Sequence, residues 1–461
     1  MTDAFRTRTN VPRGEFAFEY QPTTDQPFEN ALAKARDGER LTVDDAVALL
    51  TTGTDGDGVV PERVERVRRA ADQRRRAVVG DEVTFVANLN NNVTTACDTG
   101  CLFCNFRDSA HTFESTHEGR TRGFTRPPTE SRDIVARAVD RGISEVTSVS
   151  GLHPAFALNE EHREILDPEN PAHGYRPPEV FDVAPGSYVE QLHAMSVDDV
   201  HVHSMTPEEA QHARRGTEWS YAELYRTLSR AGLDSVPGTA AEVLVDEVRE
   251  VICPGKIGTD EWLTAIEAAA DVGLPITATM MYGHVENERH RAMHLGRIRD
   301  LQDRTGAVTE FVPLSFVHEN TPLARRGLVN GGASDLEDDL VIAVSRLFLD
   351  NVEHVQSSWV KFGDEKGLRM LDGGADDFMG TILSEEITTR AGGGHGEFRS
   401  FAEYVDLITG IDRVPVERST DYERRRRLDP ADPDPGPRLG PRADGTPLLE
   451  APRSNTVAAD D

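Results

Sequence analysis

Long apolar runs and cysteines are both scarce in this chain of 461 residues. No stretch approaches the roughly 18 consecutive apolar residues that a membrane helix needs, and the N-terminus lacks the apolar run of a secretory signal. Four cysteines are too few to hold so long a chain together as a disulfide framework. Hydrophobic residues still make up 38% of the chain, enough for a sizeable core. We therefore expect a soluble, cytoplasmic protein that does not act in a membrane.

Basic residues are also in deficit. The chain has 50 Lys and Arg against 80 Asp and Glu, a formal net charge of −30, and its lysines are only Lys34, Lys256, Lys361 and Lys366. An acidic surface of this kind repels nucleic acid and anionic lipid, so neither is expected as a partner. In molar salt the Debye length shrinks to about 3 Å, which screens the self-repulsion. The composition therefore favours a halophilic source over an acidic protein from an ordinary cell.

Three of the four cysteines lie within eight residues, in the stretch NNVTTACDTGCLFCNF. Cys97, Cys101 and Cys104 follow the spacing C-x3-C-x2-C. Three thiolates so close together can bind three corners of an iron–sulfur cube and leave the fourth iron open to a further ligand. The alternative is a structural zinc site completed by Cys253 or a histidine. Structural zinc usually uses paired cysteine knuckles, and the second pair is missing here.

Short apolar runs alternate with amphipathic segments over most of the chain. The predicted strands are 83–89, 144–149, 198–203, 232–236, 275–280, 308–314, 353–359 and 371–376. The predicted helices are 130–141, 187–195, 218–230, 239–250, 259–272, 287–304, 334–350 and 380–390. This alternation predicts an α/β fold with parallel strands and right-handed crossovers. Eight units predict a TIM-type (β/α)8 barrel, and a partial barrel of six units is the alternative.

The barrel is expected over residues 81–395, with other regions flanking it. Residues 1–80 are predicted to form a helical N-terminal flank, in which LTVDDAVALL is an amphipathic helix with a Thr N-cap. A polar, proline-rich stretch at about 155–186 predicts a surface insertion. Residues 396–461, rich in Arg, Asp and Pro, are expected to form a largely disordered C-terminal extension.

Unusual residues gather where the predicted strands end, which is where barrel enzymes place their active sites. Besides the cysteines, these candidates are Ser150, Gly151, His201, His203, Glu242, Tyr282 and His284. His201 and His203 are expected to end the third strand and to share one face of it. A single histidine at a strand end is more often a structural rim residue than a catalyst. The crowding of polar residues at several strand ends nevertheless favours a site.

The cysteine motif, with Phe106 two residues after its last cysteine, resembles that of the radical S-adenosylmethionine (SAM) enzymes. Further stretches are similar to one branch of that superfamily: GLDSVPGTAAEVL (232–244), VICPGK (251–256), TATMMYGHVE (277–286), TEFVPLSFVHENTPL (309–323) and GADDFMGTILSEEIT (374–388). The branch contains the two radical SAM components of FO synthase, which makes the deazaflavin chromophore of the factor-420 coenzyme, and two menaquinone-pathway enzymes. The resemblance is greatest to the 4-hydroxyphenyl transferase family of FO synthase components.

The resemblance implies a [4Fe–4S] cluster and SAM as cofactors, with Cys97, Cys101 and Cys104 as the metal ligands. A low-potential electron donor would trigger cleavage of SAM to a 5′-deoxyadenosyl radical. In this family the radical attacks L-tyrosine, the Cα–Cβ bond breaks, and the 4-hydroxybenzyl fragment joins 5-amino-6-(D-ribitylamino)uracil. The ring-closing FO synthase component is a further possible partner.

The resemblance also suggests roles for the other candidates. Ser150 and Gly151 match a segment that approaches the SAM amino group, although Ser150 stands where the branch has glycine. Glu242 matches an acidic residue near the SAM ribose or amino group; its alternative role is a charge at a helix N-terminus.

Four further residues are candidates for substrate binding or proton transfer: His201, His203, Tyr282 and His284. Cys253 is expected to be a buried residue and not a fourth ligand.

Three alternative functions stay open. The chain could be aminofutalosine synthase-like, it could be the ring-closing FO synthase component, or it could be a non-catalytic barrel held together by zinc.

Overall fold

The computed structural model describes residues 25–51, 61–107, 124–159, 186–383, 386–396 and 398–431. Its strands alternate with helices, as the sequence predicts. In chain order the strands are β1 (Glu82–Val86), β2 (Asn88–Asn90), β3 (Glu145–Ser148), β4 (His201–Ser204), β5 (Ile276–Tyr282), β6 (Val308–Ser315), β7 (His354–Val355), β8 (Asp377–Gly380), β9 (Val414–Arg418) and β10 (Arg425–Arg427). They form three sheets, with the orders β10-β9-β1-β8, β2-β3-β4 and β5-β6-β7. Strand β10 runs antiparallel to β9, and the other pairings between these strands are parallel.

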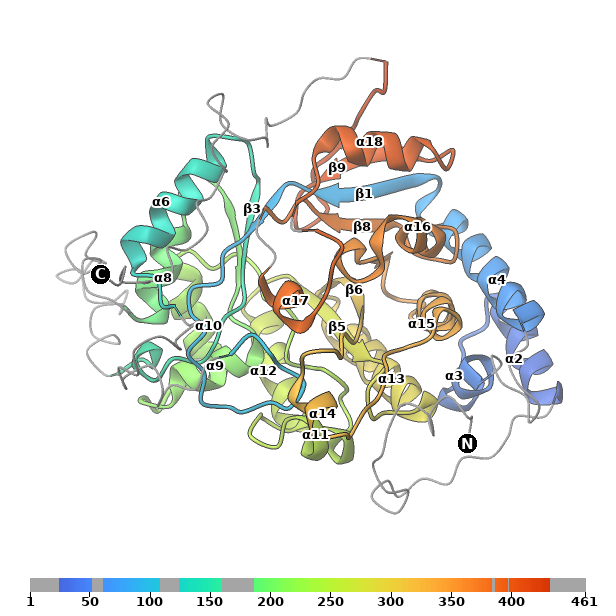
Figure 1. Ribbon diagram of the computed structural model, residues 1–461, viewed down its shortest axis with the longest axis horizontal. Helices are drawn as coiled ribbons and strands as arrows, with labels where there is room; N and C mark the ends of the chain where they lie inside the picture. Colours follow the sequence, from blue (N-terminus) through green and yellow to red (C-terminus); the bar gives the residue numbers. More distant parts are fainter. Residues whose placement is uncertain are drawn as a thin grey trace, which may run out of the picture.

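The helices cover the outside of the strands (Figure 1). They are α2 (Asp25–Asp37), α3 (Val43–Leu50), α4 (Pro61–Val79), α6 (Pro128–Val139), α8 (Tyr188–Met195), α9 (Pro207–Arg214), α10 (Tyr221–Arg230), α11 (Asp246–Ile252), α12 (Thr259–Asp271), α13 (Glu288–Thr305), α14 (Pro322–Arg325), α15 (Asp335–Phe348), α16 (Trp359–Leu371), α17 (Glu386–Ala391) and α18 (Phe401–Thr409). Many begin with a capping box, in which the N-cap side chain and the third helical residue each bond the other's backbone. Ser334 with Glu337 at α15 is one example.

The three sheets succeed one another around a common centre without forming one closed sheet. Single parallel bridges link them: His203 to Ser235, Val236 to Ile276, and Gln356 to Asp377. Strands β1 and β2 are consecutive in the chain, and β1 pairs with β8 while β2 pairs with β3. The strand order is therefore that of a barrel with interrupted hydrogen bonding, which agrees with the predicted barrel or partial barrel.

Several of the predicted strands differ from the structure. The fourth predicted strand, 232–236, is reduced to the bridged residues Ser235 and Val236. The strand predicted at 353–359 is reduced to His354–Val355, because α16 begins at Trp359. The strand predicted at 371–376 is wrong, because Leu371 ends α16 and β8 begins only at Asp377. Gly374 lies between them with a φ of 125°, a conformation that favours glycine and makes the turn. The apolar residues there belong to the end of a helix and to this turn.

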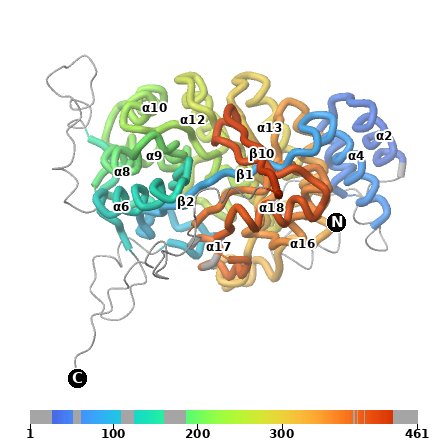
Figure 2. Tube along the Cα trace, turned by 90° about the horizontal axis from the view of Figure 1, so that it is seen from above, coloured from blue at the N-terminus to red at the C-terminus, as the bar shows by residue number. Residues whose placement is uncertain are grey.

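The N-terminal helices pack on one side of the barrel. Helix α4 contacts α15, and α3 contacts α13 and α15. The Thr42 side chain accepts a hydrogen bond from the Asp45 backbone, and the Asp45 carboxylate accepts one from the Thr42 backbone, which confirms the predicted Thr N-cap. These helices lie at one end of the molecule, while α6, α8 and α10 lie at the other (Figure 2).

The disorder expected from residue 396 onward is wrong for 398–431. Helix α18 is followed by β9, which pairs in parallel with β1 from Glu82 opposite Val414 to Val86 opposite Arg418. The prediction rested on the charged composition of this segment, but some of these charged side chains are buried and paired with opposite charges inside the fold. The Arg418 side chain is buried and donates hydrogen bonds to Asp377 (2.6 Å) and Glu310 (3.2 Å). Residues 432–461, and 160–185 of the expected insertion, lie outside the described residues.

The core is continuous across the strands and the surrounding helices. Phe85 of β1, for example, stacks on Tyr404 of α18 with ring centroids 4.2 Å apart. In the part of the chain that the structure describes, no helix is both long and apolar enough to cross a membrane.

Candidate active site

The three clustered cysteines lie in one loop, residues 91–107, which follows β2. Hydrogen bonds hold the loop between two helices: the Leu102 backbone donates to Ile252 at the end of α11 and accepts from Leu323 in α14, both at 2.8 Å. Figure 1 shows these two helices next to each other. Cys101 is buried, and burial raises the pKa of its thiol. Cys97 and Cys104 keep part of their surface exposed.

Ser150 and Gly151 follow β3 and pack against the chain just before Cys97. The Ser150 hydroxyl accepts a hydrogen bond from the Val93 backbone (2.8 Å), and the Gly151 backbone donates one to Thr94 (2.9 Å). A Cβ atom on Gly151 would lie 2.3 Å from the Ala96 carbonyl oxygen. Glycine is therefore required here for the approach of two backbones, and contact with SAM stays a prediction.

Glu209 holds the same segment and was missed by the sequence analysis. One carboxylate oxygen accepts a hydrogen bond from the Ser150 backbone (3.2 Å). The other caps α9 through the hydroxyl and backbone of Thr206 (2.8 and 2.9 Å). Burial raises the pKa of Glu209 to about 7. The Thr-x-x-Glu capping box in TPEE was the available signal.

A buried charge cluster lies beside the cysteine loop. Glu242, with a φ of 45°, accepts a hydrogen bond from the Lys256 ammonium group at 2.5 Å. That ammonium lies 5.4 Å from the centre of the Phe103 ring in the cysteine loop. Glu242 precedes α11 and is paired with Lys256, so its carboxylate is engaged by a side chain and does not cap the helix. The sequence analysis did not single out Lys256 as a site residue.

His201 lies at the opposite end of its strand from the one predicted, whereas His203 is next to the last residue of β4 and shares a face with His201, as predicted. His201 begins β4 instead of ending it, level with Glu145 at the start of β3. The expected strand started too early because Asp198 and Asp199 take positive φ values in the preceding turn. Both histidine rings bond the Ser235 hydroxyl, His201 through Nε2 (2.7 Å) and His203 through Nδ1 (2.6 Å).

The His203 ring is buried and its partners, Ser235 and Glu145, belong to neighbouring strand segments of the barrel wall. Burial lowers its pKa to about 4, against the opposing charge of Glu145. Because the cysteine loop follows the carboxyl end of its strand, the structure does not place His201 beside it. The catalytic roles suggested for these two histidines remain predictions.

Tyr282 and His284 are both buried at the end of β5. The Tyr282 hydroxyl donates to Asp338 of α15 at 2.6 Å, so the side chain contacts the outer helices. Burial raises the pKa of Tyr282. His284 lies 3.0 Å from the Met281 carbonyl oxygen through Nε2, and its Nδ1 accepts from the Val285 backbone. Both residues therefore have structural partners, and their catalytic roles stay predictions.

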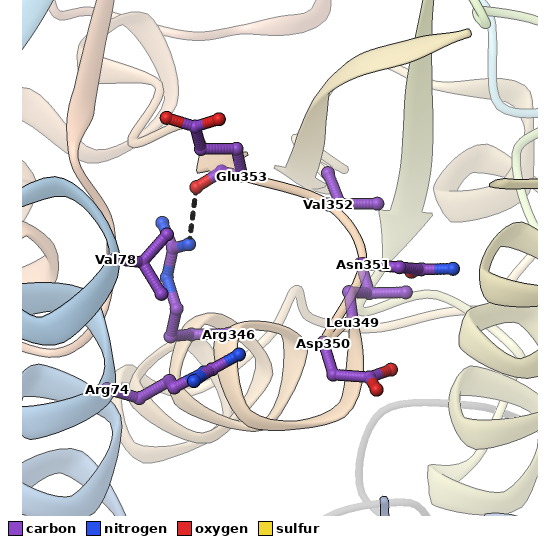
Figure 3. A pocket seen from close by; sticks show the side chains of 8 residues that line it. All are labelled: Arg74, Val78, Arg346, Leu349, Asp350, Asn351, Val352 and Glu353. Carbon is purple, nitrogen blue, oxygen red and sulfur yellow. Dashed lines mark hydrogen bonds between the residues drawn. The ribbon is translucent and has the colours of Figure 1, made fainter. Parts of the chain in front are cut away.

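A pocket of about 220 Å³ lies between α4 and the turn from α15 to β7 (Figure 3). It is lined by Arg74, Val78, Arg346, Leu349, Asp350, Asn351, Val352 and Glu353. Arg346 spans it by donating a hydrogen bond to the Glu353 carbonyl oxygen at 2.6 Å. Because it precedes β7, this pocket lies at the amino ends of the strands, opposite to the cysteine loop.

The donor set of the cysteine loop is compatible with an iron–sulfur cluster. Among the described residues, no group of three or more His, Cys, Asp or Glu side chains is arranged to hold one ion. A cubane spreads its three thiolate ligands more widely than a tetrahedral zinc ion does, and it needs soft, charged donors. Cys97, Cys101 and Cys104 would supply three such donors from one loop, and Cys97 and Cys104 are partly exposed.

Comparison with known proteins agrees with this geometry. Residues 91–298 match the radical SAM superfamily, and residues 305–429 match the CofH/MqnC C-terminal region. The second match includes β9 and β10, which the sequence analysis had placed in a disordered extension. The fold resembles that of methylornithine synthase, with a TM-score of 0.59 and 16% identity over 85% of this chain and 99% of that one.

Two relatives are similar over almost their whole length. A protein of Haloarcula marismortui is 70% identical over 95% of this chain and 98% of its own, and one of Halobacterium salinarum is 67% identical over 94% and 95%. Both carry the name 5-amino-6-(D-ribitylamino)uracil–L-tyrosine 4-hydroxyphenyl transferase. The chain therefore belongs to the radical SAM superfamily and, within it, to the family of these FO synthase transferases.

Proposed function

We propose that this chain joins the 4-hydroxybenzyl group of L-tyrosine to 5-amino-6-(D-ribitylamino)uracil in the synthesis of the deazaflavin FO. The observation that supports this most strongly is the 70% identity, over nearly the full length, to a relative named for that reaction. The match to the CofH/MqnC C-terminal region supports it over residues 305–429, which lie outside the part of the chain with the cysteine motif.

The chain's own residues would prepare the site for radical chemistry. Cys97, Cys101 and Cys104 would hold the cluster, while Gly151 and Glu242 stand where SAM is expected. When bound, the cluster and SAM supply a carbon radical that takes a hydrogen atom from tyrosine. Such a radical attacks almost any nearby group, so the protein has to fix the distance to tyrosine and exclude water.

Buried polar atoms on α8 and α9, near the segment that follows Gly151, are candidates for the substrate contacts. Tyr188, Glu208 and His212 each carry a buried polar atom without a hydrogen-bond partner in the described part of the chain. They lie on α8 and α9, and the His212 ring also contacts the His153 carbonyl oxygen (2.8 Å) in the segment after Gly151. Buried polar groups are almost always paired, so a polar ligand would supply the missing partners. Tyrosine and the ribitylaminouracil both carry several groups able to do so.

Three further parts of the proposal follow from the chemistry. A low-potential electron donor has to reduce the cluster, and the ring-closing FO synthase component is the enzyme that would use the product. The cytoplasm is the proposed location, because the cysteine ligands must stay reduced to bind iron.

The test is an anaerobic reaction at high salt. The protein is reconstituted with iron and sulfide and supplied with dithionite, SAM, L-tyrosine and the ribitylaminouracil, and products are identified by mass spectrometry. We expect 5′-deoxyadenosine together with a 4-hydroxybenzyl–uracil adduct. Cys101→Ala should abolish both products, and Cys253→Ala, the matched control, should not.

Two outcomes would contradict the proposal. Deoxyadenosine without the adduct would leave radical SAM chemistry but point to the aminofutalosine or ring-closing reactions. A colourless protein that takes up zinc and no iron would revive the non-catalytic barrel.

A further inference from the structure

Lys256 differs in position from the other lysines of this lysine-poor chain. Lys34 pairs with Asp45 and Lys366 with Asp335, each at 2.8 Å and each through carboxylates of neighbouring helices. The Lys256 side chain, 13% exposed, also pairs with a carboxylate, that of Glu242, but it lies beside the cysteine loop. An acidic protein that carries so few lysines places one of them next to its proposed metal ligands.

The backbone around Lys256 is fixed against the cysteine loop from both sides. A Cβ atom on Gly255 would lie 2.5 Å from the Thr99 carbonyl oxygen, so only glycine permits this approach. The Ile257 backbone donates a hydrogen bond to Glu208 of α9 at 3.0 Å. The Lys256 backbone itself donates to the Cys253 carbonyl oxygen at 3.0 Å. Lys256 therefore has little freedom to move away from the loop.

The Lys256 ammonium group is held in its charged form. Burial opposes the charge, but Glu242, Cys101, Cys253 and Glu208 together raise the pKa of Lys256 above its usual value. The Glu242 backbone is itself held, because its carbonyl oxygen accepts a hydrogen bond from the Met281 backbone at 2.8 Å. A positive charge is thus built into the site at every physiological pH.

The ammonium end of the ion pair approaches the cysteine loop. It lies 5.4 Å from the centre of the ring of Phe103, the residue that precedes Cys104. The positive charge of the pair is therefore next to the proposed cluster ligands.

We propose that Lys256 is a positioning residue that tunes the iron–sulfur site, its fixed positive charge stabilising the reduced cluster. The proposal rests on the cluster being bound by Cys97, Cys101 and Cys104. On reduction the cluster gains one electron from a low-potential donor, with no bond formed or broken. A mostly buried cation beside the loop that carries the proposed ligands lowers the energy of the added negative charge, because the protein interior screens charges poorly. The reduction potential is then less negative than it would be without Lys256.

The experiment is a redox titration followed by electron paramagnetic resonance, on anaerobically reconstituted protein without substrates. Lys256→Met should retain the iron and sulfide of the wild type and show a more negative midpoint potential, whereas Lys256→Arg should stay near the wild-type value. Lys366→Met is the matched control, since it removes a partly buried, ion-paired lysine from α16 and should leave the potential unchanged.

A second variant keeps the proposal testable if Lys256→Met loses the cluster. Glu242→Gln leaves the ammonium unopposed and should make the potential less negative; no change would overturn the proposal. An unchanged potential in a fully loaded Lys256→Met protein would also overturn it, as would a shift seen only after SAM is added. The titration contains no substrate, so it tests the role of Lys256 independently. A protein that forms no uracil adduct could still show the predicted shift in potential, and the reverse also holds.

Discussion

Single residues beside the cysteine loop are constrained by how closely neighbouring backbones approach. At Gly151 and Gly255 a Cβ atom would lie within 2.5 Å of a carbonyl oxygen of that loop.

The three cysteines were identified as candidate ligands from their spacing, because three ligands on one loop need only a local motif. Glu209 and Lys256 were missed, because their partners Ser150 and Glu242 lie 59 and 14 residues away in the sequence. No local pattern connects a carboxylate to a backbone N–H group on another loop.

Gly151→Ala tests the backbone contact at this scale. The added methyl group would lie 2.3 Å from the Ala96 carbonyl oxygen, so the segment before Cys97 has to move. We expect a loss of about 1–3 kcal/mol in the free energy of unfolding, as for other overpacked sites, and weaker SAM binding. Thermal unfolding and equilibrium SAM binding measure the two effects. Gly331→Ala, where a Cβ meets nothing within 4 Å, should be neutral; equal effects of both substitutions would contradict the prediction.

The raised pKa of Glu209 should make the free energy of unfolding depend on pH. Burial raises its pKa in the folded protein from 4.5 to about 7, so the protonated form favours folding. Stability from this group is present below pH 4.5 and is lost as the pH rises toward 7, by up to roughly 3 kcal/mol. Glu209→Gln should flatten the slope of unfolding free energy between pH 5 and 8.

The control for Glu209 is another capping-box glutamate. Glu403 forms the same box with Ser400, but its pKa is lowered, since hydrogen bonds from Ser400 outweigh burial. Glu403→Gln should therefore leave the slope between pH 5 and 8 as it is. Urea unfolding in molar salt across this range gives the comparison, and a wild-type slope in Glu209→Gln would refute the prediction.

At the scale of elements, the segment from β9 to β10 is part of the barrel. Its side chains contact the amino-terminal halves of several barrel strands: Thr420 donates to Glu145 (2.6 Å), and Tyr422 donates to Glu310 (2.8 Å). The Tyr422 ring also stacks on His354 with centroids 3.8 Å apart. The segment thus covers the end of the barrel opposite to the cysteine loop and donates further hydrogen bonds to the buried carboxylates of Glu145 and Glu310.

Arg418→Met tests this covering role. The substitution leaves Asp377 and Glu310 buried without their cation, and breaking such a pair typically costs about 3–5 kcal/mol. Arg426→Met on the adjacent β10 removes an ion pair with Glu417 that is more exposed, and should cost no more than about 1 kcal/mol. Urea unfolding in molar salt distinguishes the two. Similar losses for both variants would mean that Arg418 holds no buried charges in place.

The whole molecule carries a net charge of −30, and its stability should depend on salt. Self-repulsion among carboxylates acts over a Debye length of about 10 Å at 0.1 M salt and about 3 Å at 1 M. We expect the melting temperature to fall markedly between molar KCl and dilute buffer. A melting temperature that is the same in dilute buffer and molar salt would contradict this prediction.

The sequence by itself determined the cysteine motif, the strand–helix alternation, the family and the net negative charge. Each of these depends on local spacing or on composition, which are present in the chain before it folds. Only the tertiary structure decided that β9 pairs with β1, more than 300 residues away, that His201 begins its strand, and that Lys256 lies beside the cysteine loop. Such pairings depend on which buried charges and backbones meet across the fold, and no local pattern of residues records them.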